Sequence, residues 1–304
     1  MHRVEEAAPA LLGRSERAEN LRRTICRAAD APAHVLVVGE TGTGKELIAR
    51  CLHAGSRRPG GSFIPVSCRA TSPELLEADI FGRSHSDDGS GGSRPGKLDL
   101  ARHGTLFLQD VECLPLPIQA KLSRALQDGR ICRFGSNVPI QDDVRVVAST
   151  TVDIEDLCAK GEFLFELYWC LSTVEIVTSP LRDIREDIPV LFDAFLWQAA
   201  ARYQREMPSG HIDLLPELIA RSWPGNADEL RHAADRFLIG AGDGVRPAPK
   251  SLPEQVDHFE KQLIVHYLGR QRGSVSAASE DLSIPKTTLY DKLHKYGICP
   301  DAFR

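Results

Sequence analysis

Residues 35–46 read Val35-Leu36-Val37-Val38-Gly39-Glu40-Thr41-Gly42-Thr43-Gly44-Lys45-Glu46. The apolar, mostly β-branched start predicts a buried strand, and the residues from Lys45 to Ala54 have the apolar spacing of a helix. A glycine-rich turn between strand and helix lets backbone N–H groups point inward around phosphate oxygens, and the helix N-terminus adds a favourable potential. This stretch therefore predicts a strand, a phosphate loop and a helix.

Two side chains of this loop bear on its chemistry. Lys45 supplies a point charge for the outer phosphates of a nucleotide. Glu46 stands where the common pattern has Ser or Thr to help hold magnesium, so the match alone is of moderate specificity. The alternative interpretation is a glycine-rich surface turn. The strand before it and the helix after it favour binding of ATP or ADP by the whole segment 39–46.

The composition is that of a globular chain. Its 304 residues are 42% hydrophobic and 26% charged, enough for a core and for more than one domain. The apolar runs are of strand length and the N-terminus starts with charged residues, so we expect neither a membrane span nor a secretion signal. The eight cysteines lack the paired spacing of zinc ligands, which indicates reduced thiols and a cytoplasmic protein. A net charge of −5 restricts any DNA contact to a local surface.

The order of apolar patterns predicts the fold. Runs at 63–66, 105–108 and 144–148 alternate with helical stretches such as 114–127, which predicts an α/β fold with a doubly wound parallel sheet. From about residue 183 helix follows helix, and residues 240–250 have linker composition. We therefore expect four parts: an α/β nucleotide-binding subdomain (1–182), a helical lid (183–240), a linker (241–251) and a small all-α domain (252–304).

Several segments in a fixed order carry a resemblance over almost the whole chain. They are Gly39–Arg50, Gly104–Leu108, Leu114–Gln127, Pro180–Pro189 and Trp223–Asn226. The chain resembles the sigma-54-dependent transcriptional activators, the bacterial enhancer-binding branch of the AAA+ ATPases, in which glutamate usually follows the loop lysine. Its C-terminal part is most similar to the regulators of C4-dicarboxylate transport. Those proteins usually carry a receiver domain, but the ATPase-like part here begins at Leu12-Gly13, so we expect no receiver and no phosphorylation switch in cis.

The resemblance also places the residues for hydrolysis, and several differ. Hydrolysis needs a carboxylate that organises magnesium, a second that activates water, and positive charge on the phosphates. The acidic pair of the family becomes Gln109-Asp110, so an amide stands at the magnesium position and a shorter acid at the catalytic one. We expect weakened Mg²⁺ binding, with Asp110 as the remaining candidate base and no assigned metal ligands.

The positive charges that the family places around the phosphates are also missing. The resemblance puts the arginine fingers at Leu164 and Cys170, which carry no charge, and the second sensor arginine at Asp228, which repels a phosphate. The first sensor asparagine is Thr151, and the polar residue that restrains the catalytic acid is Ser67. Together these changes predict ATP binding without hydrolysis at the family's usual rate.

In the family, a loop inserts an aromatic side chain into the sigma factor. The matching stretch, 84–95, is rich in Ser, Gly and Asp and has no aromatic residue. It has the composition of a surface loop and cannot make the same apolar contact. An interaction with sigma-54 RNA polymerase is therefore in doubt.

The C-terminal part carries an apolar stripe and a two-helix pattern. The stripe, at helical spacing, either pairs with a second copy or packs within the monomer; it consists of Leu252, Val256, Phe259, Leu263 and Tyr267. After Gly273, helices over 275–282 and 285–296 are similar to a Fis-type helix-turn-helix. The core between them is predicted to contain Ala278, Leu282, Ile284, Leu289 and Leu293.

The second helix of this pattern carries the candidates for DNA contact. They are Lys286, Thr287, Thr288, Tyr290, Lys292 and Lys295. The threonines near the helix start suit base edges or phosphates, and the lysines suit phosphates. The alternative interpretation is a solvated charged face.

Three functions follow from these patterns. The leading hypothesis is a DNA-binding transcription regulator that binds nucleotide and self-associates as a dimer or ring, as a repressor or in mixed oligomers with an active relative. The enzymatic alternative is an ordinary sigma-54 activator that hydrolyses ATP with Asp110 as base and with Arg182 or Arg185 replacing the lost fingers. The third is a ring-forming adaptor that rarely meets DNA. The expected partners are double-stranded DNA and other protein copies, with no membrane.

Overall fold

The computed structural model describes residues 11–69, 72–83, 95–132, 139–141, 143–208 and 211–240, and within 260–300 all but positions 262, 266, 272, 283, 297 and 299. The chain forms two compact units, Met1–Gly242 and Asp243–Arg304. Most of the stretch predicted to replace the sigma-contacting loop lies outside the described residues, as do the predicted linker and the first three residues of the apolar stripe.

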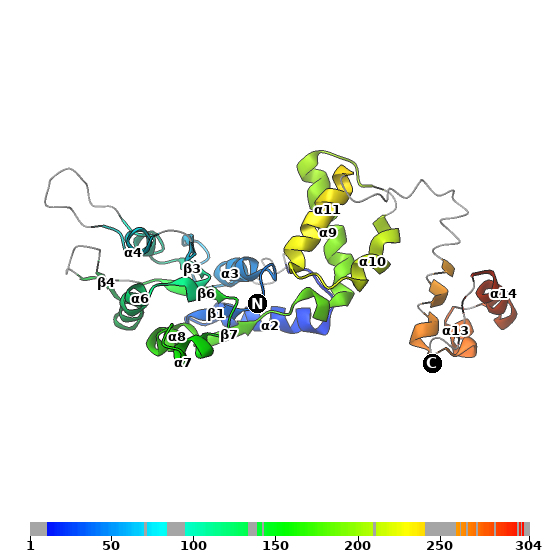
Figure 1. Cartoon of the computed structure of the whole chain (residues 1–304), viewed down its shortest axis with the longest axis horizontal. Helices are drawn as coiled ribbons and strands as arrows, with labels where there is room; N and C mark the ends of the chain where they lie inside the picture. Colours follow the sequence, from blue (N-terminus) through cyan, green and yellow to red (C-terminus); the bar gives the residue numbers. More distant parts are fainter. Residues whose placement is uncertain are drawn as a thin grey trace. The chain divides into compact units, whose positions relative to one another are not determined.

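A five-stranded parallel sheet forms the centre of the first unit, in the order β2-β3-β6-β1-β7 (Figure 1). Its strands are β1 (Val35–Val38), β2 (Phe63–Ser67), β3 (Thr105–Gln109), β6 (Arg145–Thr150) and β7 (Val174–Val177). The predicted α/β fold with a parallel sheet is confirmed. The sequence analysis missed β7, an edge strand in which only Ile176 is buried and the apolar signal is correspondingly weak.

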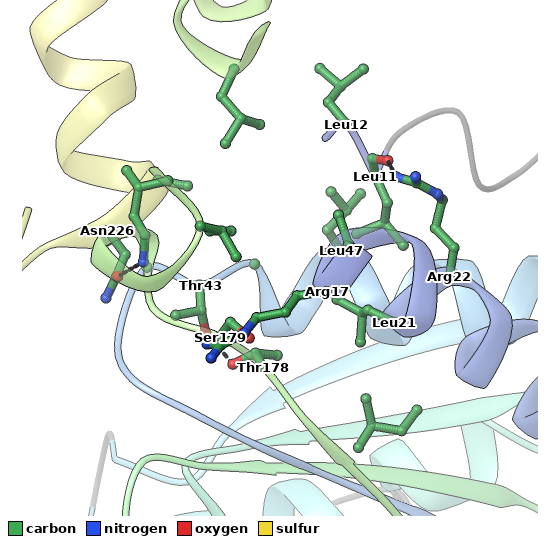
Figure 2. Close-up of a pocket in the computed structure, with 18 of the residues that line it drawn as sticks. Leu11, Leu12, Arg17, Leu21, Arg22, Thr43, Leu47, Thr178, Ser179 and Asn226 are labelled. Carbon is green, nitrogen blue, oxygen red and sulfur yellow. Dashed lines mark hydrogen bonds between the residues drawn. The ribbon is translucent and has the colours of Figure 1, made fainter. Parts of the chain in front are cut away.

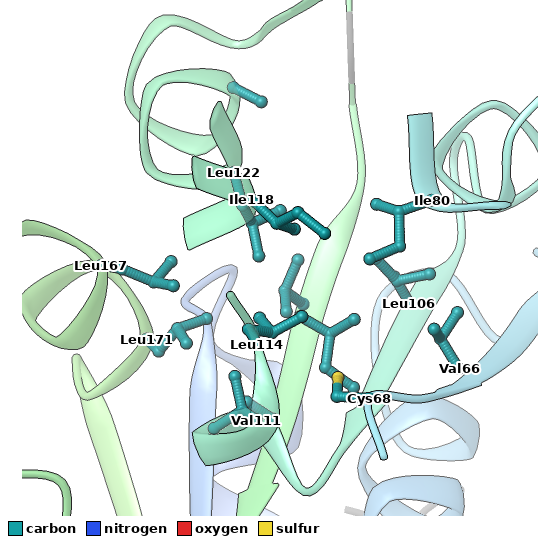
Figure 3. Packing of buried hydrophobic residues seen from close by; sticks show 14 of the residues in the cluster. Val66, Cys68, Ile80, Leu106, Val111, Leu114, Ile118, Leu122, Leu167 and Leu171 are labelled. Carbon is teal, nitrogen blue, oxygen red and sulfur yellow. The ribbon is translucent and has the colours of Figure 1, made fainter. Parts of the chain in front are cut away.

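Helices cover both faces of this sheet. They are α2 (Glu16–Asp30), α3 (Lys45–Ala54), α4 (Pro73–Phe81), α5 (Lys97–Leu100), α6 (Leu116–Asp128), α7 (Ile154–Ala159) and α8 (Phe165–Leu171). Successive strand residues point to opposite faces. Leu106 packs with α4 to α8 on one face (Figure 3), and Phe107 packs with α2 and α3 on the other. The short antiparallel pair β4 (Arg130–Cys132) and β5 (Pro139–Gln141) stands apart from this sheet.

A helical lid follows the sheet. It consists of α9 (Ile188–Tyr203), α10 (Leu215–Ala220) and α11 (Asn226–Ile239), with the 3₁₀ turns η3 (Leu181–Asp183), η4 (Arg185–Asp187) and η5 (His211–Leu214). Its core is centred on Trp223, which is 1% exposed and donates its indole N–H to the carbonyl of Leu218 at 2.7 Å. Trp223 and Asn226 both have positive φ, 51° and 50°, so the turn before α11 is tightly constrained.

The second unit contains α13 (Val275–Asp281) and α14 (Lys286–Tyr296), and its described residues between 260 and 270 are helical. The predicted core is confirmed: Ala278, Leu289 and Leu293 are buried, and Leu282 and Ile284 pack against them. The preceding helix contributes Ile264 and Leu268 rather than Leu263, which is 36% exposed. Across the described parts of both units, every helix is too short or too polar to span a bilayer.

Candidate functional site

The loop between β1 and α3 has the backbone of a phosphate cradle. Gly42 and Gly44 have φ of 78° and 87°, in the left-handed region that favours glycine. A Cβ at Gly42 would lie 2.2 Å from the carbonyl oxygen of Gly225, so only glycine fits there. The hydroxyl of Thr43 donates to the carbonyl of Glu40 at 2.8 Å and accepts from Thr178 at 2.8 Å. These contacts fix the loop independently of any ligand.

Lys45 is held inside this loop. Its Nζ donates to the carbonyls of Gly39 at 2.7 Å and Glu40 at 2.9 Å. Burial lowers the pKa of the ammonium, and the nearby carboxylates of Asp110 and Glu112 partly oppose that shift. A cation at the centre of a cradle of backbone groups is the arrangement that binds the outer phosphates of a nucleotide.

A polar network joins the loop to the lid. Both terminal nitrogens of Arg182 bind the Glu40 carboxylate, at 2.8 and 2.6 Å. The pKa of Glu40 is lowered to about 2, first by Arg182 and then by Asn226. The buried Asn226 accepts from the N–H of Leu181 at 2.8 Å and donates to the carbonyl of Thr41 at 2.9 Å. The loop and the lid are therefore linked by the first residue of α11.

A cavity of about 930 Å³ opens beside the loop, between the N-terminal segment, β7 and the lid. Figure 2 shows Leu12, Leu21 and Leu47 on one side of it and Thr43 and Asn226 on the other. An apolar wall beside a phosphate cradle suits a ligand with a flat apolar ring and a polyphosphate, and the volume is within the range of small-molecule sites. The residues present therefore fit a nucleotide.

A second cavity of about 520 Å³, which we call the outer cavity, is lined by Lys45. Gln109 and Asp110 reach it from the end of β3. Asp110 has a positive φ of 57°, is 8% exposed, and accepts a 2.7 Å hydrogen bond from Nε of Arg69. Its carboxylate is therefore bound to a cation of the same chain. Arg69 was not singled out from the sequence, although it is the second residue after β2, the strand next to β3.

The other positions predicted to depart from the family lie near this site or on α8. Asp228 lines both cavities and pairs with Arg231 at 3.4 Å. Thr151 donates its backbone N–H and its hydroxyl to Glu112, at 3.2 and 2.9 Å. Leu164 packs against the core as the residue before α8, and Cys170 is partly buried on that helix.

Magnesium does not fit the donor set of the outer cavity. Mg²⁺ is normally held by one or two carboxylates together with substrate phosphates. Here Gln109 offers a neutral amide, and Asp110 is bound to Arg69. Over the described residues, no three His, Cys, Asp or Glu side chains are grouped so that they could hold a metal ion.

The helix α14 presents most of the residues predicted to contact DNA. Lys286, Thr287 and Tyr290 are exposed, and Tyr290 is 56% exposed. Lys295 is also exposed, whereas Thr288 is half-buried. Lys292 differs, because its Nζ binds the carboxylate of Glu260, which also accepts from the hydroxyl of Tyr296 at 2.6 Å. The structure therefore places Lys292 in a contact within the unit.

Comparison with known families accounts for this combination of parts. Residues 11–177 match the family model of the sigma-54 interaction domain. The chain belongs to the sigma-54 activator family. Residues 182–264 match the AAA+ ATPase lid domain, and residues 255–296 match the Fis family of bacterial regulatory proteins. The resemblance inferred from the sequence is confirmed.

Two known transcriptional regulators match almost the whole chain. The C4-dicarboxylate transport transcriptional regulatory protein DctD of Rhizobium meliloti is 38% identical over 309 residues, covering 98% of this chain and 67% of that protein. The formate hydrogenlyase transcriptional activator of Salmonella typhimurium is 36% identical over 322 residues, covering 99% of this chain and 46% of that one. The chain thus spans 46% to 67% of the length of these two relatives.

A solved structure supports the same assignment. NtrX from Brucella abortus in complex with ATP matches with a TM-score of 0.71 and 30% identity, over 94% of this chain and 69% of that one. The AAA+ fold of a sigma-54 activator is therefore shared over the sheet and the lid. The bound ATP is a property of NtrX and motivates the proposal below.

Proposed function

We propose that this member of the sigma-54 activator family is a DNA-binding transcription regulator that binds ATP or ADP through residues 39–46 and does not hydrolyse ATP at a rate useful to a motor. The contrast between the two ends of the nucleotide site carries the proposal. The loop around Lys45 has a complete backbone cradle, whereas Asp110 is bound to Arg69 and follows an amide instead of an acid.

The arrangement explains why hydrolysis is disfavoured. A general base must lie within hydrogen-bond reach of the attacking water. Oδ2 of Asp110 is instead occupied by Arg69, and Arg182, a candidate replacement for a lost finger, binds Glu40 of its own chain through both terminal nitrogens. Removing one charge-stabilising group commonly lowers a rate by about 10²–10³. The loss of several such groups leaves binding as the activity of the site.

DNA binding is assigned to α14. The exposed Lys286, Thr287 and Tyr290 lie along its first half, the part of a recognition helix that enters the major groove. Lys286 gives a phosphate contact, and Thr287 reaches a base edge or a phosphate. Lys292 is left out of this proposed set because its Nζ binds Glu260 of the same unit.

The second unit thus supplies a matched pair of lysines for testing DNA binding. Duplexes selected from a random library by the full chain serve as the probe, measured by fluorescence anisotropy. Lys286→Ala is expected to weaken binding and reduce its salt dependence. Lys292→Ala is expected to lower the melting temperature of the unit, with a smaller effect on DNA affinity. Equal loss of DNA affinity in both variants contradicts this assignment.

Self-association is assigned to the face of α8. Phe165 and Trp169 lie one turn apart with ring centroids 5.6 Å apart, and Trp169 is 64% exposed. An exposed aromatic pair on a helix matched to the subunit-contacting part of the family suits a second copy of the chain. A Trp169→Glu variant that sediments with the same oligomeric state as the wild type excludes this face.

Nucleotide binding and turnover are measured on one preparation. Calorimetric titration with ATP and ADP is expected to show binding that Lys45→Ala abolishes. A phosphate-release assay, with and without the selected DNA, is expected to show no turnover above that of Lys45→Ala. Turnover that depends on Lys45 and on Asp110 would return the chain to the class of working motors.

A further inference from the structure

The outer cavity is lined by basic and acidic side chains in close alternation. Among the residues that the structure describes there, the basic ones are Lys45, Arg50, Arg69 and Arg231, and the acidic ones are Glu46, Asp110 and Asp228. Each carboxylate pairs with one arginine of the same cavity: Glu46 with Arg50 at 2.7 Å, Asp110 with Arg69 at 2.7 Å, and Asp228 with Arg231 at 3.4 Å. The charge left over is the ammonium of Lys45.

This pairing has a consequence for metal binding. A magnesium ion needs a carboxylate that is not already neutralised. Every described carboxylate that lines the outer cavity is engaged by an arginine, and Gln109 offers only an amide. The nearby Glu112 does not line the cavity, and its Oε1 accepts from Thr151. The positive charge in the outer cavity thus comes from lysine and arginine side chains of the protein and not from a metal ion.

Two of the three arginines have N–H groups that are not used by their carboxylate partners. Arg50 is committed to its own helix, because both Nε and a terminal nitrogen bind Glu46 and its guanidinium lies 4.7 Å from the Phe63 ring. Arg231 donates to Asp228 at 3.4 Å through one terminal nitrogen, its guanidinium lies 4.9 Å from the Phe195 ring, and its buried Nε has no hydrogen-bond partner. Arg69 uses Nε alone, and its side chain is 57% exposed.

A buried hydroxyl points to the same ligand chemistry. Ser149, at 0% exposure in β6, lines the outer cavity, and its Oγ has no hydrogen-bond partner. A buried polar group without a partner is unfavourable unless a ligand or water completes it. Unpaired donors on Ser149 and Arg231 beside the ammonium of Lys45 suit an anion with several oxygens.

We propose that Arg69 and Arg231 bind the terminal phosphate of ATP in place of a magnesium ion, so that the site distinguishes ATP from ADP without a metal. This inference rests on the proposed binding of nucleotide by residues 39–46. A phosphate carries more charge and more acceptor oxygens than a carboxylate, and guanidinium groups bind it in bidentate fashion. Arg69 binds Asp110 through Nε and Arg231 binds Asp228 through one terminal nitrogen, so their remaining N–H groups bind the phosphate while both carboxylates stay paired.

The two arginines come from different parts of the first unit. Arg69 follows β2 of the sheet, and Arg231 lies on α11 of the lid. A terminal phosphate that binds both joins sheet and lid, whereas ADP lacks the phosphate that makes this connection. The site is thus a sensor of the ATP-bound state that needs no hydrolysis step.

The test is calorimetric titration of the full chain with ATP and with ADP, each in excess magnesium and in excess EDTA. ATP affinity is expected to change by less than about threefold between the two buffers. Arg69→Ala and Arg231→Ala are each expected to weaken ATP binding about tenfold or more and ADP binding by about twofold or less, since a hydrogen bond to a charged group is worth about that much.

Matched controls separate this role from a structural one. Arg221, like Arg231, forms an ion pair and a contact with an aromatic ring, and Arg57, like Arg69, pairs with an aspartate, but neither lines the outer cavity. Arg221→Ala and Arg57→Ala are expected to leave both affinities unchanged. Asp110→Asn releases Arg69 and is expected to strengthen ATP binding several-fold more than ADP binding.

The outcomes are distinct. ATP binding that EDTA weakens tenfold, or arginine variants that weaken ATP and ADP equally, would overturn the inference while leaving the proposed nucleotide binding intact. A wild-type chain that binds neither nucleotide overturns both. Arginine variants with an unchanged thermal melt and a selective loss of ATP affinity support the inference.

Discussion

The two ends of the nucleotide site differ in whether backbone or side-chain groups form them. The cradle around Lys45 is made mainly of backbone: the left-handed glycines, the carbonyls that hold the ammonium, and the Thr41 carbonyl, which accepts from the side chain of Asn226. The outer cavity is made of side chains, each arginine paired with a carboxylate. A site made of backbone conformation survives many substitutions, whereas catalysis by side chains is lost when a few of them change. Binding and hydrolysis can therefore separate within one cavity.

The largest effect is expected at Gly42. A methyl group there meets the Gly225 carbonyl at 2.2 Å on a backbone with φ of 78°, so Gly42→Ala is expected to lose nucleotide binding and about 3 kcal/mol of folding free energy. At Gly44 the added atom meets nothing within 4 Å, so Gly44→Ala is expected to lose only about 1 kcal/mol. Urea denaturation and nucleotide titration compare the two, and equal losses contradict a cradle defined by Gly42.

The next effect is expected at Asn226, where the cradle meets the lid. Asn226→Ala leaves the buried N–H of Leu181 without its partner and removes the contact with the carbonyl of the exposed Thr41, at a cost of about 2 kcal/mol. Urea denaturation of the full chain measures this loss. Asn20→Ala, at an exposed position, is the control and should be neutral. A neutral Asn226→Ala would show that the loop holds its shape without the lid.

A smaller effect is expected when an acid is restored to the outer cavity. Gln109→Asp supplies the missing carboxylate, but the positions matched to the arginine fingers, Leu164 and Cys170, stay uncharged. Phosphate release is expected to rise by less than about tenfold, because the roles of these groups in hydrolysis are not interchangeable. A rise of a thousandfold would place the whole defect at Gln109.

The smallest effect concerns the pair of Glu40 and Arg182. The pKa of Glu40 is about 2 in the fold, below its ordinary 4.5, so its stabilisation is present above pH 4.5 and is lost as the pH falls toward 2. Because the pair is partly exposed, we expect less than about 1 kcal/mol. Denaturation at pH 6 and pH 3 should show that wild type and Glu40→Gln differ less at the lower pH. A constant difference would assign the effect to packing.

The sequence predicted what local patterns encode. The apolar run of β1, the glycines of the loop and the spacing of Leu289 and Leu293 each specify an element or a core contact within a few residues. Family resemblance then located Gln109 and Asp110 at the end of β3. The strand β7 was missed because an edge strand with one buried residue carries little periodic signal.

What could not be predicted depends on contacts distant along the chain. Arg69 meets Asp110 only because β2 and β3 are neighbours in the sheet. The position of Lys292 on its helix suggests a phosphate contact. Its contact with Glu260, which is 32 positions away, cannot be read from the sequence. Arg231 carries no motif signal of its own, since the family motif ends at Asp228, one turn earlier on the same helix. In each case a charged residue was assigned by its helix or motif, while its partner came from elsewhere in the fold.

The side-chain amide of Asn226 acts as a mechanical coupling. Its oxygen accepts from Leu181, the first residue of η3, and its nitrogen donates to Thr41 of the loop, on a backbone whose φ of 50° leaves little freedom. A rotation of α11 therefore displaces Thr41, and a change of loop conformation on ligand binding displaces α11. Asn226 therefore couples occupancy of the cradle to the orientation of α11.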